Sequence, residues 1–302
     1  MSKISQFYET STKHSEIVKL MRPHQWLKNL LVLLVPLMAA KLKVGYVVSS
    51  FATVFAFCLM SSAIYVINDY VDRDRDKLHP TKKKRPLPSG AVRPSTAIGL
   101  SVSLVSISLV VSYAINIDVF LVLISYTIIN IVYCYWTKHI PLIEMVSISS
   151  GFVLRVISGA FAIQATLNPN IVGSVAAASF SLITMKRRSE LKQSSRRVEQ
   201  RPVLANYSIS SLDQIMMCSC CIAALLLIIA TNKVDPTLAG ITTYSIMILV
   251  VLAGLSHLFQ IAQGHNMEDP ARSLIQDRYS KIILAVMIIL VTITARMSSV
   301  FS

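Results

Sequence analysis

Four aspartates lie within eight residues of this 302-residue chain, in the sequence NDYVDRDRD of residues 68–76. If the apolar helix that precedes them continues, Asp69, Asp72 and Asp76 fall on one helix face, within an arc of roughly 60°. Carboxylates that share a face repel one another unless a cation lies among them. Because Mg²⁺ binds such hard oxygen ligands together with substrate phosphates, these three acids are predicted to bind Mg²⁺ and to be catalytic.

The same helix predicts where the neighbouring side chains lie. Asn68 is expected to contact the substrate, whereas Asp74 is expected to point away from the shared face. The alternative is a solvated loop in which the acids pair with basic neighbours, namely Arg73, Arg75 and Lys77. Acids beside a membrane-buried helix end are costly to place and usually functional, so the metal site is favoured.

A basic, proline-containing segment, HPTKKKRPLPSG, follows at residues 79–90. Each proline fixes its own φ and restricts the residue before it, so a shaped loop is expected. Two functions remain open for this basic loop. It could close over bound phosphates as a cationic lid, with Lys83 and Arg85 contacting the substrate. It could also anchor the chain to anionic lipid headgroups.

Long apolar segments must position these groups. The chain is 54% hydrophobic and 15% charged, whereas about a quarter of the residues of a soluble domain are charged. Its apolar runs extend over roughly 18–24 residues, enough to cross the hydrocarbon core of a bilayer. A soluble globular enzyme, a disordered tail and a disulfide scaffold are thereby excluded. An all-α polytopic membrane protein with nine transmembrane helices is predicted, with spans at 25–40, 46–67, 95–114, 117–136, 142–163, 170–185, 212–230, 237–260 and 281–298.

The distribution of charge predicts how the spans are oriented. With the N-terminus in the cytoplasm and the C-terminus outside, all but five of the 29 lysines and arginines lie on the cytoplasmic side, as the positive-inside rule requires. The basic excess therefore does not indicate nucleic-acid binding. Residues 1–20 are expected to form a polar cytoplasmic leader, and residues 21–302 a single transmembrane domain. The Ile-, Ser- and Lys-rich composition suggests a bacterial inner (plasma) membrane protein, with its site facing the cytoplasm.

Ionisable residues within or beside the spans are further candidates for substrate binding. Glu144 and Arg155 lie eleven residues apart in the fifth span, where charged groups are usually functional. The alternative is a structural charge pair, or contacts of the two with Asn130. Lys28, near the start of the first span, is expected either to bind a substrate phosphate or to anchor its helix at the interface.

Two clusters of polar residues lie at the cytoplasmic ends of the fourth and sixth predicted spans. Tyr133 and Lys138, near the end of the fourth span, are candidate phosphate ligands. Lys186, Arg187 and Glu190 are predicted to follow the sixth span, where an arginine fork can hold two phosphate oxygens at once. The alternative for this second cluster is a juxtamembrane group of charges that only sets the topology.

Six motifs, in order along the chain, resemble those of the UbiA superfamily of intramembrane transferases. NDxxDxxxD at 68–76, with HPxKxxRPxxSG at 79–90, is similar to the first aspartate-rich motif of that superfamily. The other motifs are RPHQWLKN at 22–29, YCYWTKHIP at 133–141, GFVLR at 151–155 with Gly159, KRRSEL at 186–191, and the segment from Gly264 through EDP at 268–270 to Asp277 and Arg278. Together, over about residues 20–298, they resemble the decaprenyl-phosphate phosphoribosyltransferase branch.

The resemblance implies a UbiA-like helical bundle that transfers 5-phosphoribose from phosphoribosyl pyrophosphate (PRPP) to a polyprenyl phosphate in the bilayer, decaprenyl or similar. Mg²⁺ on the aspartates would bind the departing pyrophosphate, and the product would serve cell-envelope polysaccharide synthesis. Typical prenyltransferases of the superfamily carry a second DxxxD motif after the sixth helix. Basic residues stand there in this chain, at 186–188, and suit the additional 5-phosphate of PRPP.

Other functions are weighed against ribosyl transfer. The runner-up is prenyl transfer from a prenyl diphosphate to a polar or aromatic acceptor. Transport of small anions is disfavoured because the spans lack the midplane polar groups and repeats that are typical of transporters. A non-catalytic interaction role is also disfavoured, while a homo-oligomer is compatible with the sequence.

Overall fold

The computed structural model describes residues 15–39, 43–192, 202–230 and 277–297, together with 245–246, 249–250, 253–254 and 257. Within these residues the chain forms helices joined by turns and loops, and no strand. In chain order the elements are η1 (Pro23–Leu33), α2 (Leu34–Met38), α3 (Val44–Val71), α4 (Arg73–Lys77), η2 (Lys82–Lys84), α5 (Pro94–Ile115), α6 (Ile117–Tyr135), η3 (Thr137–His139), α7 (Ile143–Ala162), α8 (Pro169–Lys192), η4 (Pro202–Asn206), α10 (Ile209–Ala230) and α13 (Arg278–Met297).

The helices agree with the predicted all-α membrane class. Among the described residues, five helices are long and apolar enough to cross a bilayer, namely α3, α5, α6, α7 and α10. Each coincides within a few residues with a predicted span, and the chain is an integral membrane protein. The predicted span 237–260 and the leader residues 1–14 lie largely or wholly outside the described residues. The count of nine spans and the orientation of the termini stay predictions.

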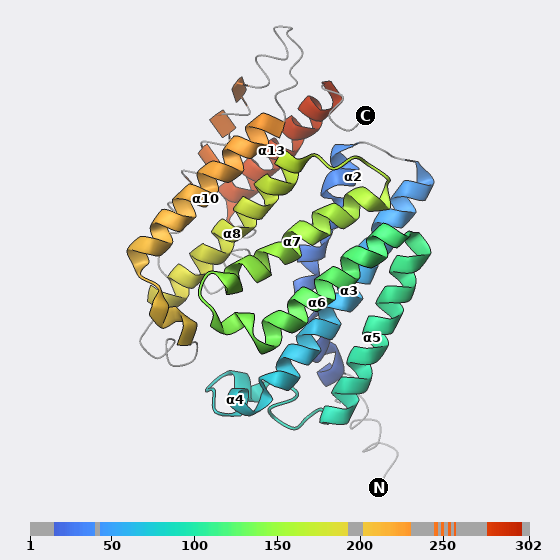
Figure 1. The fold of residues 1–302 in the computed structure, drawn as a ribbon, viewed down its shortest axis with the longest axis vertical. Coiled ribbons are helices and arrows are strands. Elements are labelled where there is room, and N and C mark those ends of the chain that lie inside the picture. The colour runs from blue at the N-terminus through green and yellow to red at the C-terminus, as the bar shows by residue number, and fades with distance from the viewer. Residues whose placement is uncertain are drawn as a thin grey trace.

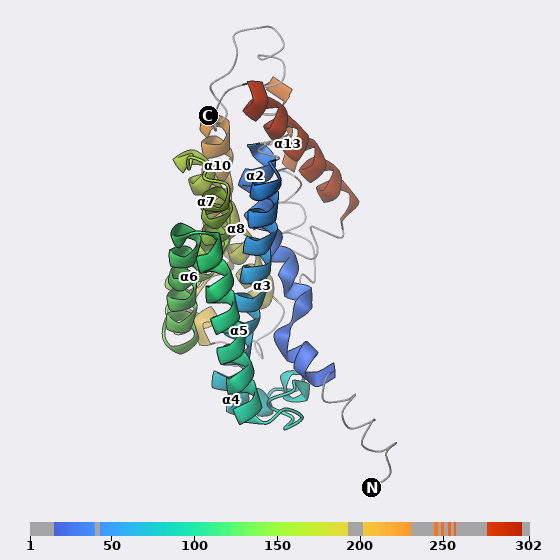
Figure 2. The same cartoon turned by 90° about the vertical axis from the view of Figure 1, so that its right-hand side faces the viewer.

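Consecutive long helices run in opposite directions, so their ends gather at two ends of one bundle (Figure 1). The ends of α3, α6 and α8 and the starts of α5, α7 and α10 lie at the end that carries α4. This end is called the α4 end below. Seen from the side, α2 and α13 lie next to each other near the opposite end (Figure 2). The acid motif and the basic loop therefore both lie at the α4 end.

The first predicted span departs from an α-helix. Residues Pro23–Leu33 form a 3₁₀-helix, and α-helical geometry begins only at Leu34. Side chains three residues apart align in a 3₁₀-helix, and every third residue of η1 packs into the bundle. On this face the Trp26 indole N–H donates to Ser62 Oγ on α3 at 2.9 Å, and Asn29 and Val32 are fully buried.

A close backbone approach fixes η1 against α7. A Cβ atom at Gly159 would lie 1.8 Å from the backbone oxygen of Val32. That oxygen would accept the helical hydrogen bond of residue 36, but Pro36 has no N–H to donate. The absence of a side chain at Gly159 thus lets η1 and α7 pack together, and one turn earlier on each element Arg155 on α7 donates to Asn29 on η1.

We expect Gly159→Ala to lower the stability of the folded bundle, by about 1–3 kcal/mol or more, because the added methyl group collides with backbone. The measurement is the midpoint of thermal unfolding in detergent. Gly99→Ala on α5 is the matched control, since nothing lies within 4 Å of a Cβ atom there. Equal midpoints for the two variants would show that η1 and α7 do not depend on this approach.

Candidate functional site

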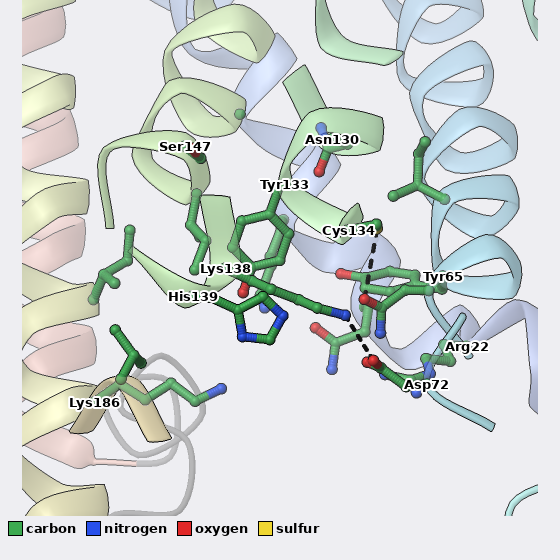
Figure 3. Close-up of a pocket in the computed structure, with 18 of the residues that line it drawn as sticks. Arg22, Tyr65, Asp72, Asn130, Tyr133, Cys134, Lys138, His139, Ser147 and Lys186 are labelled. Carbon is green, nitrogen blue, oxygen red and sulfur yellow. Dashed lines mark hydrogen bonds and ion pairs between the residues drawn. The ribbon is translucent and has the colours of Figure 1, made fainter. Parts of the chain in front are cut away.

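A cavity of about 420 Å³ opens at the α4 end, between η1, α3, α6, α7 and α8 (Figure 3). Its charged lining is strongly one-sided. Nine basic side chains line it, namely Arg22, Lys28, Arg75, Lys82, Arg85, Lys138, Arg155, Lys186 and Arg187. Two acidic side chains do so, Asp72 and Asp76. Such a lining attracts polyanions, because like charges gathered in a cleft reinforce one another's field.

Two of the three predicted metal ligands converge on one atom. Asp69 and Asp76 are buried, with exposed fractions of 1% and 3%. The Nη1 atom of Arg85 lies 3.1 Å from Asp69 Oδ1 and 2.7 Å from Asp76 Oδ2. Two carboxylates that reach one cationic atom suit Mg²⁺, which usually combines one or two carboxylates with waters and substrate phosphates. The donor set therefore fits the predicted ion.

The third predicted ligand, Asp72, has a different basic partner from these two. The helix breaks where α3 ends at Val71 and α4 begins at Arg73, and Asp72 accepts a hydrogen bond from Lys138 Nζ at 2.6 Å (Figure 3). The expected stripe of three carboxylates is thus divided. Within the described residues, no group of three His, Cys, Asp or Glu side chains is gathered around a potential metal site.

Asp74 points away from the site, as predicted. Its side chain is 69% exposed and pairs with Lys77 at 2.8 Å and with Arg73 at 3.4 Å. Lys77 and Arg73 lower the pKa of this carboxyl below its usual value by hydrogen bonding and charge. The solvated alternative considered for the acid motif therefore describes Asp74, while Asp69 and Asp76 lie inside.

The basic loop folds over the acids. Besides the contacts of Arg85, Lys82 Nζ lies 3.7 Å from Asp76 Oδ1, and burial lowers the pKa of this ammonium. Pro86, Leu87 and Pro88 are buried, so the loop is shaped as the prolines predict. Lys83, in contrast, is exposed and does not line the cavity. The observed contacts favour the lid over the lipid anchor.

Arg22 is a site residue that the predicted set does not contain. It adopts the left-handed backbone conformation (φ 52°) just before η1. Its Nη2 atom donates to Asp69 Oδ1 at 2.5 Å, and its guanidinium lies over the Tyr65 ring, 5.2 Å from the centroid. Arg22, Gln25 and Lys28 all line the cavity. Their spacing of three residues is the signal for one face of a 3₁₀-helix, and an α-helical interpretation hides it.

The predicted residues of the sixth span belong to the helix itself. Helix α8 continues to Lys192, so Lys186, Arg187 and Glu190 lie in its last turns instead of following it. The continuation holds because Arg187 is satisfied within the bundle. Its Nε and Nη2 atoms donate to the two oxygens of Glu144 on α7 at 2.6 and 2.8 Å, and its Nη1 atom donates to Glu190 at 2.8 Å.

This pairing gives the polar residues of α7 and α8 different positions. Glu144 is fully buried behind Arg187 and, like Glu190, does not line the cavity. Lys186 lines the cavity, and its ammonium points into it from the side opposite Asp72 (Figure 3). Arg187 reaches the cavity with an exposed fraction of 1%. Lys186 is therefore the α8 cation best placed to meet a ligand directly.

Arg155 lies deep in the cavity wall on α7. It pairs with neither Glu144 nor Asn130, the two partners considered for it. Its Nε atom donates to Asn29 Oδ1 on η1 at 2.8 Å, and its Nη2 atom donates to the Tyr126 hydroxyl on α6 at 3.1 Å. These bonds join three elements around one guanidinium.

The remaining predicted residues also lie at the cavity. Asn68, Tyr133, Lys138 and Lys28 line it, and Asn68 Oδ1 accepts a hydrogen bond from the Cys134 thiol at 3.5 Å. Further polar lining residues outside the predicted set are Gln25, Tyr65, Tyr126, His139 and Ser147. They come from five separate elements, so no local pattern in the sequence unites them.

Sequence and fold are both similar to those of known proteins. The model of the UbiA prenyltransferase family matches residues 29–282. The decaprenyl-phosphate phosphoribosyltransferase of Mycolicibacterium smegmatis is 35% identical over 212 residues, which cover 66% of this chain and 64% of that protein. The protein of the same name from Corynebacterium glutamicum is 33% identical over 58% of this chain and 54% of that protein. The matches thus span between about half and two thirds of these relatives' lengths.

Solved structures share the architecture. A UbiA homolog from Archaeoglobus fulgidus, bound to GPP and Mg²⁺, has a TM-score of 0.71 at 18% identity. The alignment covers 93% of this chain and 99% of that chain, which shows a common fold. The resemblance noted in the sequence motifs is therefore confirmed over most of the chain: the protein is an enzyme of the UbiA prenyltransferase family.

Proposed function

We propose that the protein transfers 5-phosphoribose from PRPP to a polyprenyl phosphate, releasing pyrophosphate. The observation that carries this proposal is the excess of nine basic over two acidic side chains in the cavity lining. PRPP brings a 5-phosphate, with a charge of about −2 at pH 7, in addition to its diphosphate, and the acceptor brings another phosphate. The relatives named decaprenyl-phosphate phosphoribosyltransferase support the same substrate class.

The acid motif is assigned to the diphosphate of PRPP. Asp69 and Asp76 would hold Mg²⁺, with Asp72 as a nearby third carboxylate. A bound Mg²⁺ supplies charge neutralisation for the leaving pyrophosphate. Arg85 and Lys82 contact these carboxylates. Both cations therefore lie beside the proposed diphosphate position and can bind its oxygens.

The other cations are assigned to orienting the two substrates. Lys186 binds the 5-phosphate, while Arg187 holds the end of α8 in place through Glu144 and Glu190. Lys28 and Tyr133 lie on the cavity wall, where they contact phosphate or sugar oxygens. The acceptor phosphate is already an anion at pH 7, so no general base is needed. The contribution of the enzyme is then positioning and stabilisation of charge.

The setting of the reaction follows from the same proposal. The apolar bundle holds the polyprenyl chain in the bilayer, and the highly charged PRPP enters from the aqueous side at the α4 end. By the positive-inside rule that side is the cytoplasm of a bacterial cell. The lipid-linked phosphoribose then serves as a precursor for cell-envelope polysaccharides. A homo-oligomer is compatible with this arrangement.

Prenyl transfer is the second candidate, favoured by the family match and by the A. fulgidus homolog bound to GPP and Mg²⁺. It would use a prenyl diphosphate as the donor and a polar or aromatic acceptor. The last turns of α8 argue against it, because Lys186 and the Arg187–Glu144 pair stand where a second acidic metal motif is expected in typical prenyltransferases.

We expect membranes that contain the protein to move label from ribose-labelled PRPP into an organic-extractable, acid-labile lipid. Because Mg²⁺ neutralises the leaving group, chelation of divalent ions should abolish the transfer and added Mg²⁺ should restore it. Mass analysis identifies the lipid product. Lipid labelled instead from a prenyl diphosphate, with none from PRPP, would establish the second candidate.

Asp69→Asn and Asp76→Asn should each lower turnover roughly 100-fold or more, as expected for loss of a charge-stabilising group. They should also weaken binding of Mn²⁺, measured by electron paramagnetic resonance on the purified protein. Asp74→Asn is the matched control, since this exposed acid of the same motif points away. Mn²⁺ binding that is equal in all three variants would contradict the metal assignment.

Lys186→Ala should raise the KM for PRPP about tenfold or more, the effect of losing one charged hydrogen bond to phosphate, with little change in thermal stability. Lys192→Ala, at the exposed end of the same helix, should leave KM unchanged. Arg187→Ala should mainly destabilise the fold, because it leaves the buried Glu144 carboxylate without its cation. An unchanged KM for Lys186→Ala would remove this residue from the 5-phosphate site.

A further inference from the structure

Three arginines are buried within the described residues, and their partners differ. Arg187 donates to Glu144 and Glu190, and Arg188 donates to both oxygens of Asp213. Arg155, with an exposed fraction of 6%, forms an ion pair with no carboxylate of the described residues. Carboxylates balance the positive charges of Arg187 and Arg188 inside the bundle, whereas no carboxylate of the described residues balances the charge of Arg155.

The surroundings of Arg155 orient its guanidinium without neutralising it. The three hydrogen bonds go to neutral acceptors, namely the Asn29 amide oxygen, the Gly151 carbonyl and the Tyr126 hydroxyl. The Phe57 and Phe152 rings lie 5.4 and 5.9 Å from the guanidinium carbon. A guanidinium has five N–H donors, so two remain beyond these bonds for a ligand in the cavity that Arg155 lines.

Such a charge is costly at this position. Arg155 lies in the middle of a helix that is apolar and long enough to span the bilayer, and ionisable groups at that depth are usually functional and pair with an opposite charge. The aromatic rings recover only part of the lost hydration energy. A ligand anion is the partner that the site itself does not provide.

The position of Arg155 along the bundle separates this anion from the diphosphate. Asn29, which accepts from Arg155, donates to Ser61 Oγ on α3 at 3.2 Å. Ser61 precedes Asp69 by eight residues, about 12 Å along the helix axis. The anion at Arg155 therefore lies deeper in the membrane than the Asp69–Asp76 pair, while still in the same cavity.

We propose that Arg155 binds a phosphate monoester at the deep end of the cavity, across the reacting sugar from the acid motif. This inference rests on the proposed function. Two sources offer the same chemistry, the phosphate of the polyprenyl acceptor and the 5-phosphate of PRPP, for which Lys186 is the other proposed ligand. Because the acceptors that hold this guanidinium are neutral, its positive charge is available to attract an anionic ligand. Its planar arrangement of N–H donors also matches the oxygens of a phosphate.

The test measures binding, without turnover, on the purified full-length protein in detergent. Farnesyl phosphate stands for the lipid acceptor, ribose 5-phosphate stands for the other source, and farnesol is the neutral control. Dissociation constants are determined by titration calorimetry for the wild type, Arg155→Gln and Arg155→Lys. We expect Arg155→Gln to raise the dissociation constant of at least one of the two phosphates roughly 10- to 100-fold, because a charged hydrogen bond is lost. The dissociation constant of farnesol should be unchanged.

The pattern of loss identifies the source. A loss confined to farnesyl phosphate assigns the acceptor phosphate to Arg155, and a loss confined to ribose 5-phosphate assigns the 5-phosphate. Partial recovery in Arg155→Lys is expected, because the charge returns without the fork. Equal dissociation constants for both phosphates in wild type and Arg155→Gln would overturn the proposal.

The stability of the ligand-free protein provides a second test. Because loss of Arg155 leaves only neutral acceptors and no carboxylate without a partner, Arg155→Gln should lower the unfolding temperature only slightly. Arg187→Gln should unfold at a clearly lower temperature, since Glu144 loses its cation. A loss of stability in Arg155→Gln as large as that in Arg187→Gln would give Arg155 a structural role and overturn the proposal. Phosphate binding at Arg155 without ribosyl transfer by the wild type would instead reject the proposed reaction.

Discussion

The buried charges at the α4 end have to be neutralised by one another or by a ligand, because isolated ions in surroundings of low dielectric are strongly disfavoured. Asp69 and Asp76 are neutralised by Arg22, Arg85 and Lys82 together, and Glu144 is neutralised by Arg187. The Arg187–Glu144 pair joins α8 to α7, and the Arg22–Asp69 pair joins the start of η1 to α3, so electrostatics and architecture are specified together. What the pairs leave over is positive, and this excess gives the cavity its preference for phosphates.

The helices could be predicted from the sequence because the thickness of a bilayer sets the length of an apolar run. The expected span 95–114 is Pro94–Ile115 in the structure, and 117–136 is Ile117–Tyr135. Helix ends were less predictable. Helix α8 continues through charged residues to Lys192 because Arg187 finds acidic partners inside the bundle, and no hydropathy pattern contains that information.

The site was predictable in its residue types and less so in its contacts. Asp69 and Asp76 lie where the acid motif suggested, and Asp74 points away. Pairings between helices could not be predicted from the sequence, since Arg155 and its partner Asn29 are 126 residues apart. A loop contact such as that of Arg85 with both acids also requires the folded chain.

The 3₁₀ geometry of η1 has a consequence for how this wall of the cavity tolerates change. Its period of three sends Arg22, Gln25 and Lys28 to the cavity and Trp26, Asn29 and Val32 to the packed interior, while His24, Leu27 and Leu30 are exposed. The three environments therefore occupy separate triplets of positions. Substitutions in the first triplet can retune ligand preference while the exposed and packed triplets are untouched. Inserting or deleting a single residue would instead rotate all three triplets by about 120° and exchange them.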